Sequence, residues 1–465
     1  MNSLLKNFLK ILLVSFVCCL TILLFSEPVL AFCGFYVAKA DTSLYNRASQ
    51  VIIARDGQRT ILTMANDYQG EAKDFALVVP VPVVLQKEQV NVGDRQILER
   101  LDAFSAPRLV EYFDNNPCQP YPMMESDMMT RGALNNSPAS KAARSNEALG
   151  VKIEAKFSVG EYDILVLSAR ESKGLETWLT QNDYKIPQGA SQVLHPYIKQ
   201  GLKFFVAKVN LKEYARNGFQ SLRPLMMAYE SPKFMLPIRL GMVNAKGPQD
   251  LMVYVLSPKG AAEVTNYRTV KIPSDEDIPE FVQQEFGGFY QAMFKTSYQR
   301  AGRNAVFLEY AWNMNNCDPC SANPLTPEEL KKAGVFWLES PVSTVFISRL
   351  HLRYTPDKFP EDLQFQTTAN QNSFQGRYVL RRPYRGEMNC DAARTYRQTV
   401  RDRQEKEAQT LAQLTGWHLS DIRKRIQFME GQSQPWWHNL WPVRYRKAIA
   451  ANRSLIVGND CGLIP

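Results

Sequence analysis

The sequence predicts a β-rich α+β fold with mixed or sandwich-like sheets, peripheral helices and a helical, basic C-terminal part. Three observations support this prediction. Short β-branched and apolar segments follow one another over most of the chain, separated by Gly, Pro, Ser or Asn. A strong hairpin signal lies near the N-terminus. The periodicity becomes helical and highly charged only in residues 392–429.

The chain begins with a segment typical of export. Lys6 and Lys10 precede an apolar run over residues 11–25, and small or modest residues follow up to Ala31. The run of about 15 residues is shorter than the roughly 20 that a membrane-spanning helix needs. We therefore predict a signal peptide over residues 1–31, with an uncleaved N-terminal anchor as the alternative. The rest of the protein is expected in the periplasm or outside the cell.

Residues 49–64 carry the clearest local signal. Two apolar, β-branched segments flank an Asp-Gly pair, which favours the type I′ turn of a β-hairpin because both central residues need positive φ. The next apolar segment, residues 75–85, also has the composition of a strand. Pro80 and Pro82 lose their amide hydrogens on the same side of it. We predict an edge strand, or a strand that leaves its sheet at this point.

Two helices are expected next. Asp94 caps an amphipathic helix whose apolar side chains share one face over residues 97–104. Pro107 then opens a second short helix, which ends before Cys118. From there to about Gly150 the sequence is rich in Met, Ser, Asn and Ala without a clean period, and we predict a long surface loop.

The remaining chain divides by composition and charge. We predict an N-terminal hairpin and helix unit with its loop (32–150), a β-rich central region (151–385) and a helical C-terminal region (386–465). Residues 376–465 carry 16 Lys and Arg against 8 Asp and Glu, whereas residues 32–375 are formally neutral. The basic excess of the protein therefore belongs to its last fifth.

Six cysteines follow the predicted signal peptide, and an even number in an exported chain predicts disulfides. Phe32 precedes Cys33, whereas a bacterial lipid anchor needs a small residue at that position, so lipidation of Cys33 is not expected. We pair Cys33 with Cys118, because both border the N-terminal unit and a loop of that size would stabilise by roughly 4–5 kcal/mol in the chain-entropy model. The disulfide candidates are Cys33, Cys118, Cys317, Cys320, Cys390 and Cys461.

Cys317 and Cys320 form a CxxC pair, a pattern that thiol–disulfide oxidoreductases use. In such enzymes the reactive cysteine lies at a helix N-terminus, which lowers its pKa. Here the residues up to Pro324 disfavour a helix at the pair, and a capping box begins only at Thr326. We therefore favour a structural disulfide, keep thiol–disulfide exchange as the alternative function, and leave cross-pairing with the later cysteines open. A zinc site would need two further ligands.

No catalytic motif is present elsewhere. None of the four histidines has metal-ligand spacing, and there is no nucleophile elbow, Walker loop or dinucleotide fingerprint. The carboxylates of Asp275, Glu276 and Asp277 precede a proline and are expected in a solvated turn before a helix. We expect no catalytic residue, no metal and no cofactor, and we lean toward a protein that is not an enzyme.

Aromatic and basic residues cluster near the C-terminus. Such clusters suit a membrane surface, an anionic envelope polymer or a partner protein. The alternative is that the tryptophans pack this tail onto the rest of the protein while the cations stay in water. Nucleic acid is not expected as a partner of an exported chain. The cluster comprises Trp436, Trp437, Trp441, Arg444, Arg446 and Lys447.

Several segments resemble a bacterial exported family known as domain of unknown function 2330. They include "CGFYVAKAD", "YNRASQVIIARDGQRTILTMANDYQG", "LDAFSAPRLVEYFDNNPC" and "CDPCSANPLTPEEL", spread from residue 33 to about residue 385. The resemblance implies export and a shared fold, and it supplies no reaction, ligand or catalytic residue. Together with the residues above, it leads us to expect a cell-envelope protein that acts by binding or scaffolding.

Overall fold

The protein has an α+β fold, seen in a computed structural model, as the sequence predicts. The structure describes residues 35–38, 45–46, 49–65, 68–69, 75–119, 151–182, 189–216, 222–244, 247–315, 322–338 and 344–430. These residues divide into two compact units. The first contains residues 35–110, 151–276 and 286–379, and the second contains 111–119, 277–285 and 380–430. Each unit is thus assembled from segments that are separated in the sequence.

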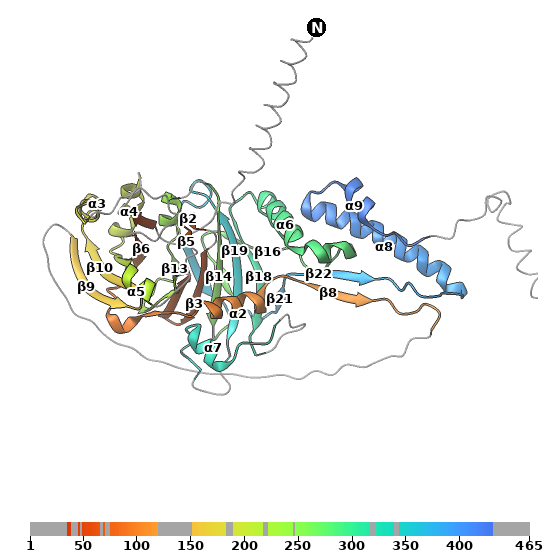
Figure 1. Cartoon of the computed structure of the whole chain (residues 1–465), viewed down its shortest axis with the longest axis horizontal. Coiled ribbons are helices and arrows are strands. Elements are labelled where there is room, and N and C mark those ends of the chain that lie inside the picture. Colours follow the sequence, from red (N-terminus) through yellow and green to blue (C-terminus); the bar gives the residue numbers. More distant parts are fainter. Residues whose placement is uncertain are drawn as a thin grey trace, which may run out of the picture. The chain divides into compact units, whose positions relative to one another are not determined.

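A five-stranded antiparallel sheet forms one layer of the first unit (Figure 1). Its strand order is β1-β6-β11-β10-β9. The strands are β1 (Phe35–Ala38), β6 (Phe75–Val81), β9 (Val151–Val159), β10 (Tyr162–Ala169) and β11 (Lys203–Val209).

A larger, nine-stranded mixed sheet forms the second layer. Its order is β16-β18-β19-β14-β3-β4-β12-β7, and β21 also pairs with β18. The pairs β14–β3 and β16–β18 are parallel. The strands are β3 (Ser49–Asp56), β4 (Arg59–Ala65), β7 (Val90–Val92), β12 (Leu225–Glu230), β14 (Gln249–Ser257), β16 (Arg268–Lys271), β18 (Ala305–Asn313), β19 (Phe346–Tyr354) and β21 (Phe374–Gln375).

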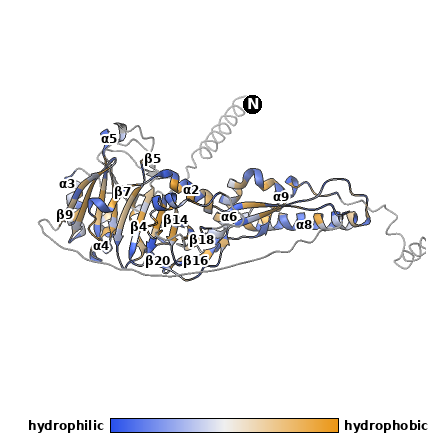
Figure 2. Ribbon diagram, turned by 90° about the horizontal axis from the view of Figure 1, so that it is seen from below, coloured by the Kyte–Doolittle hydropathy of each residue, from blue (hydrophilic) through white to orange (hydrophobic). Residues whose placement is uncertain are grey.

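The two sheets pack face to face, since buried residues of both, such as Val51, Leu62 and Ile164, belong to one hydrophobic cluster. Figure 2 shows hydrophobic segments along these strands. Helices cover the outer faces, which are also apolar, so the first unit is a β-sandwich between helical layers. The covering helices are α3 (Ser172–Gln181) and α4 (Ala190–Lys199) on the smaller sheet, and α2 (Arg95–Ser105), α6 (Phe286–Arg300) and α7 (Pro327–Lys332) on the larger one.

Shorter elements complete the first unit. A three-stranded sheet has the order β13-β20-β15, and its strand β15 lines a pocket. Within the described residues, no helix combines the length and the apolar character needed to cross a bilayer. These shorter elements are β2 (Tyr45–Asn46), β5 (Tyr68–Gln69), β13 (Met235–Leu236), β15 (Ala262–Val264), β20 (Leu363–Thr367), η1 (Lys87–Gln89), η2 (Leu240–Asn244) and α5 (Leu211–Arg216).

The local predictions near the N-terminus are confirmed in part. Strands β3 and β4 form the predicted hairpin, with Gly57 at a φ of 57° in the turn. The carboxylate of Asp94 caps α2 by accepting a hydrogen bond from the backbone N–H of Gln96 at 3.0 Å. Pro80 lies beyond the residues of β6 that pair with β1, and β6 ends at Val81. The strand therefore leaves its sheet here, and the edge-strand alternative is wrong because β6 lies between β1 and β11.

The predicted second helix after Pro107 is wrong. Residues Arg108–Phe113 form strand β8 of a third sheet, whose order is β17-β22-β8. The backbone N–H of Arg108 donates to the carbonyl of Gly376 at 3.0 Å. A partner strand far along the chain thus satisfies this backbone and overrides the local helical pattern. The other two strands are β17 (Glu276–Asp277) and β22 (Arg377–Arg382).

The second unit contains the predicted C-terminal helices. Helix α8 (Asp391–Thr415) ends at Gly416, whose φ of 74° lies in the left-handed region that favours glycine, and α9 (Leu419–Arg425) follows. Figure 1 shows the two helices next to each other. The unit also contains η3 (Glu280–Glu285) and the C-terminal parts of β8 and β22.

A disulfide bond joins Cys118 to Cys390 in the second unit, with the two Cα atoms 5.7 Å apart. The predicted pairing of Cys33 with Cys118 is therefore wrong. The reason is the strand order: β8 and β22 lie side by side, so the residues that follow them meet. Residue spacing along the chain does not reveal this proximity.

Candidate functional site

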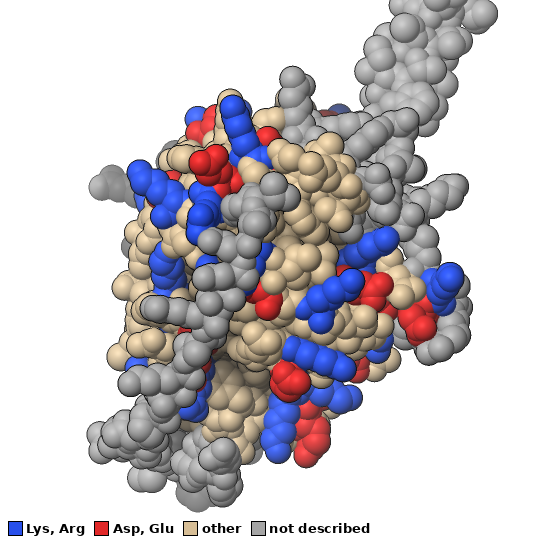
Figure 3. All heavy atoms as spheres, turned by 90° about the vertical axis from the view of Figure 1, so that its left-hand side faces the viewer, with Lys and Arg blue, Asp and Glu red and all other residues tan. Residues whose placement is uncertain are grey.

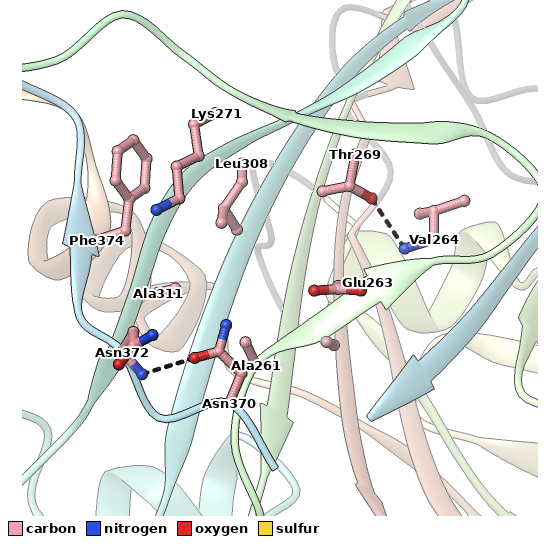
Figure 4. Close-up of a pocket in the computed structure, with 11 residues that line it drawn as sticks. Ala261, Glu263, Val264, Thr269, Lys271, Leu308, Ala311, Asn370, Asn372 and Phe374 are labelled. Atoms are coloured by element: carbon pink, nitrogen blue, oxygen red, sulfur yellow. Dashed lines mark hydrogen bonds between the residues drawn. The ribbon is translucent and has the colours of Figure 1, made fainter. Parts of the chain in front are cut away.

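A polar pocket of about 270 Å³ lies at the β16 end of the larger sheet (Figure 4). Strands β16, β18 and β21 form one side of it, and β15 with the loop after β20 forms the other. Leu308 and Ala311 of β18 give it an apolar floor. The polar side chains that line it are Glu263, Thr269, Lys271, Asn370 and Asn372.

The strand register places a cation and an aromatic ring together in this pocket. Lys271 lies opposite Leu308 in the β16–β18 pair, and Phe374 lies opposite Ala311 in the β18–β21 pair. The ammonium nitrogen of Lys271 is 4.7 Å from the centre of the Phe374 ring, which is a cation–π contact. Figure 4 shows the Lys271 side chain extending from β16 between Phe374 and Leu308.

The loop that carries the two asparagines is held by backbone hydrogen bonds. Ala261 N–H donates to the carbonyl of Asn370, and Thr368 N–H donates to the carbonyl of Ala261, both at 2.8 Å. The approach is so close that a Cβ atom on Gly260 would lie 2.5 Å from the carbonyl oxygen of Asn370. The loop is therefore fixed before any ligand arrives, and position 260 requires glycine.

Hydrogen bonds inside the pocket leave some polar groups available. The side-chain oxygen of Asn370 accepts from the N–H of Asn372 at 3.0 Å, and the hydroxyl of Thr269 accepts from the N–H of Val264 at 3.1 Å. Within the described residues, the amide nitrogen of Asn370 donates to no protein group. The carboxylate of Glu263 likewise has no hydrogen bond or ion pair among them. The pocket thus offers free donors and a free acceptor to a ligand.

The opposite face of β18 carries a buried network of charged side chains. Glu309 is fully buried and accepts hydrogen bonds from Arg349 Nε at 2.7 Å and from the hydroxyl of Tyr290. His351 Nδ1 lies 2.9 Å from the Glu309 carboxylate. The ring of His351 stacks on Phe294 of α6 with the ring centres 3.7 Å apart.

Ion pairs extend this network on both sides of Glu309. Arg349 Nη1 donates to the carboxylate of Asp102 at 2.6 Å. Arg353 donates to both carboxylate oxygens of Asp250 at 2.7 Å, and His351 Nε2 lies 3.6 Å from the same carboxylate. When His351 is protonated, three cations and three carboxylates balance in charge. Burial is tolerated because every charge has a partner.

A β-bulge in β18 separates the pocket from the network. The pairing of β18 with β19 shifts between Leu308 and Tyr310, so Glu309 is the extra residue. Its carbonyl accepts a hydrogen bond from Gly376 N–H at 2.7 Å. Leu308 therefore lines the pocket, whereas Glu309 and Tyr310 both lie on the other face of the sheet.

The electrostatics of the network favour charged side chains. Burial would raise the pKa of Glu309, but the charges of His351 and Arg349 lower it to about 2. Burial would lower the pKa of His351, but the carboxylates of Glu309 and Asp250 raise it above its usual value. Because carboxylates face both ring nitrogens, His351 is held as an imidazolium without a free lone pair. The network is therefore suited to stabilising the fold rather than to general-base catalysis.

The family of the protein follows from its sequence match. Residues 27–366, about three quarters of the chain, match the family described as uncharacterized protein conserved in bacteria (DUF2330). The chain belongs to this family. The description of DUF2330 names no reaction or ligand, so the pocket and the network have no assigned role. No curated protein and no solved structure matches the chain.

Most of the site residues predicted from the sequence of this DUF2330 protein lie outside the described residues. Cys118 and Cys390 are described and bonded to each other. Among the described residues, no group of His, Cys, Asp and Glu side chains is arranged to hold a metal ion. The predicted residues outside the described part are Cys33, Cys317, Cys320, Cys461, Trp436, Trp437, Trp441, Arg444, Arg446 and Lys447.

The sequence did not indicate the role of His351. His195 and His418 are exposed, whereas His351 is buried between carboxylates that are 42 and 101 residues away in the sequence. One signal was present: Arg349, His351 and Arg353 alternate with apolar residues, so they share one face of a strand. Three cations on one face of a strand indicate acidic partners opposite them.

The acidic residues 275–277 agree only in part with the predicted solvated turn, because Glu276 and Asp277 form strand β17, which neighbours β22. Asp275 has a φ of 62° and is exposed, and Ser274 and Asp277 are partly exposed. Asp275 pairs with Arg377 and Asp277 pairs with Arg381, the latter at 2.9 Å. These carboxylates therefore form ion pairs with β22.

Proposed function

We propose that this DUF2330 protein is exported to the cell envelope and acts there by binding a small polar ligand in the pocket between β15, β16 and β18. The observation that carries the proposal is the set of prearranged polar groups over an apolar floor, a composition typical of small-molecule sites. The pocket has a volume of about 270 Å³. This space suits an amino acid or a monosaccharide.

Two features support export. The N-terminal 31 residues have the order of charged, apolar and small residues that signal peptides share. The disulfide bond between Cys118 and Cys390 belongs to the kind that persists in oxidising compartments. Fractionation of cells that express the full chain is expected to place the mature protein outside the cytoplasm. Recovery of the full-length chain in the cytoplasm would contradict export.

A binding role is favoured over catalysis by the state of the titratable groups. The buried His351 contacts carboxylates through both nitrogens, so it has no free position for a proton transfer. In the pocket, Glu263 has no His, Cys or Ser beside it among the lining residues. Among the lining residues, no hydrogen bond or ion pair joins Thr269 or Lys271 to Glu263, so the pocket shows no nucleophile paired with a base.

Filling the pocket tests the binding proposal. Asn372 is exposed at the pocket's edge, and an Asn372→Trp variant would occupy the space without disturbing the core. We expect at least one compound from a panel of amino acids and monosaccharides to raise the Tm of the wild-type protein, because a ligand that binds the native state stabilises it. The variant should lose this response.

Asn304→Trp is the matched control, since Asn304 is exposed and lies outside the pocket. It should keep the full response to the compound. If no compound shifts the Tm of the wild type, or if Asn372→Trp responds as the wild type does, the pocket is not a ligand site.

We further propose that the C-terminal aromatic and basic cluster attaches the protein to an envelope surface. Support comes from the sequence alone, which places three tryptophans beside three cations in residues 434–447. Truncation after Glu430 removes the cluster and keeps α8 and α9. We expect the truncated protein to move from the envelope fraction to the soluble exported fraction. Unchanged fractionation would contradict the attachment role.

On the face shown in Figure 3, Lys and Arg side chains lie among Asp and Glu side chains. A mixed surface of this kind differs from the single-sign patches that bind anionic polymers. The tail is therefore a better candidate for an anionic partner than this face of the protein.

Thiol–disulfide exchange by Cys317 and Cys320 stays a competing prediction, since both cysteines lie outside the described residues. An insulin-reduction assay decides it. Turnover by the wild type that is lost in a Cys317→Ser variant would establish this activity in place of a purely binding role.

A further inference from the structure

Two opposite charges line the pocket without pairing with each other. Glu263 projects from β15 and Lys271 from β16, and no ion pair joins them or links either to another described residue. Exposed cations and carboxylates that are close enough usually pair, although the gain is small. Here Lys271 instead contacts the Phe374 ring, and Glu263 has no partner among the described residues.

The separation of the two charges is fixed by the backbone. Glu263 lies opposite Gln366 in the β15–β20 pair, and Lys271 lies opposite Leu308 in the β16–β18 pair. The connection between β15 and β16 is itself tied down, because Thr265 N–H donates to the carbonyl of Gln364 at 2.8 Å. The two charges therefore belong to different sheets, and neither strand can shift toward the other without losing its pairing.

From this geometry we infer that the ligand is zwitterionic and carries an ammonium group and a carboxylate, as an α-amino acid does. The inference rests on the proposed function, since it concerns the same pocket. The Lys271 ammonium and the free amide nitrogen of Asn370 are donors for the ligand's carboxylate. The Glu263 carboxylate is the acceptor for the ligand's ammonium group, and Leu308 and Ala311 contact its apolar part.

Other small ligands leave part of this arrangement unused. A neutral sugar brings no charge to either Glu263 or Lys271. A ligand with only a carboxylate pairs with Lys271 but is repelled by Glu263. A ligand with only an ammonium group pairs with Glu263 but is repelled by Lys271. Only a molecule with both charges satisfies both residues at once.

Isothermal titration calorimetry with a matched set of ligands tests the inference. The twenty common amino acids are screened first on the mature, oxidised protein. The tightest binder is then compared with the amine that lacks its carboxylate, with the acid that lacks its ammonium group, and with D-glucose. We expect the amino acid to bind at least about tenfold more tightly than either single-charge analogue, because each lost charged contact costs at least that factor.

Charge variants assign the two ends of the ligand. Lys271→Gln should weaken binding of the amino acid and of the acid analogue by about tenfold or more and leave the amine unchanged. Glu263→Gln should weaken the amino acid and the amine and leave the acid unchanged. A double variant that exchanges the two charges, Glu263→Lys with Lys271→Glu, should bind the amino acid better than either single reversal.

Lys358→Gln is the control for loss of a surface cation outside the pocket, and it should bind as the wild type does. Circular dichroism confirms that each variant is folded before titration. If D-glucose binds and no amino acid does, or if the charge variants bind the amino acid normally, the inference is wrong while the proposed function stands. If nothing in the panel binds, both are wrong.

Discussion

Glu309 is surrounded by three donors that come from one strand and one helix of the first unit. Arg349 and His351 of β19 and Tyr290 of α6 all contact its carboxylate. The carboxylate is fully buried, so water cannot replace a lost partner. A substitution here leaves charges without compensation, and its cost is set by desolvation rather than by the number of contacts.

The Glu309→Gln variant should be strongly destabilised. The amide keeps the size of the side chain but removes the negative charge that balances Arg349 and His351. Breaking a buried ion pair in this way costs about 3–5 kcal/mol in the free energy of unfolding. Urea denaturation followed by circular dichroism measures the loss. Glu361→Gln, on the surface, should stay within about 0.5 kcal/mol of the wild type.

The stabilisation that His351 provides should depend on pH. Burial acts to lower the pKa of His351, but Glu309 and Asp250 raise it above 6.5, its ordinary value. A group with a raised pKa in the folded state stabilises the fold fully below the unfolded pKa, and this stabilisation is lost as the pH rises through the folded pKa. The difference in unfolding free energy between the wild type and His351→Gln should therefore shrink as the pH rises above 6.5.

Urea denaturation of both proteins at several pH values from about 6 upward, around the ordinary histidine pKa of about 6.5, gives this difference directly. A difference that stays constant or grows with pH would show that His351 is not a cation in the fold.

At the scale of elements, the loop after β20 determines the shape of the pocket. It is bonded to Ala261 by two backbone hydrogen bonds and approaches Gly260 closely. This attachment holds the asparagines of the loop in place, and pairing with β20 holds β15 in place. The pocket is therefore a property of the paired elements and not of a single loop.

Gly260→Ala should damage both stability and ligand binding. The added Cβ would lie 2.5 Å from the carbonyl oxygen of Asn370 and 2.8 Å from that of Thr368, so the loop must move. Such overpacking costs typically about 1–3 kcal/mol. Thermal denaturation and the ligand titration measure the two effects. Gly288→Ala in α6, where no atom lies within 4 Å of the new Cβ, should cost nothing. Equal behaviour of the two variants would contradict the proposed role of Gly260.

Elements whose signals are local could be predicted from the sequence. The β3–β4 hairpin, the Asp94 cap and the C-terminal helices each depend on residues within one turn or one helix, and all are present. Strand β8 could not be predicted, because its partner β22 begins at Arg377, far along the chain. Local propensity favoured a helix there, but pairing with the distant strand β22 makes these residues a strand.

The candidate site could not be predicted for a similar reason. Glu263, Lys271 and Asn370 are ordinary polar residues in the sequence and become a site only after β15 pairs with β20 and β16 pairs with β18. The even number of cysteines did indicate disulfides. The partner of Cys118 depends on the order of strands in a sheet, which spacing does not contain.

At the scale of the whole molecule, three separate segments of the chain contribute to the second unit. Residues 111–119, 277–285 and 380–430 contribute to it, and the disulfide bond joins the first of these segments to the last. Arg382 connects the same segments by pairing with Glu111 at 2.6 Å and with Glu280 at 3.1 Å. The unit is small, so the cross-link is expected to be a large part of its stability.

Removing the disulfide with Cys118→Ser and Cys390→Ser should destabilise the second unit. The bond joins residues that are 272 positions apart, and the chain-entropy model gives about 5–6 kcal/mol for a loop of this length. Amide hydrogen exchange is expected to show faster exchange in α8 and α9. A non-reducing peptide map of the wild type should contain a Cys118–Cys390 peptide. A map with Cys118 joined to another cysteine would contradict the structure.

The order of synthesis gives this bond a further consequence. At about 5–20 residues per second, the 272 residues between Cys118 and Cys390 take roughly 15–55 seconds to make. Cys33 is made before Cys118 and is only 85 residues away in the sequence, so it is the first thiol that Cys118 can meet. A Cys33–Cys118 bond formed at that stage would have to be exchanged before the Cys118–Cys390 bond of the second unit could form. Efficient production of this protein should therefore depend on a disulfide isomerase in the compartment where it folds.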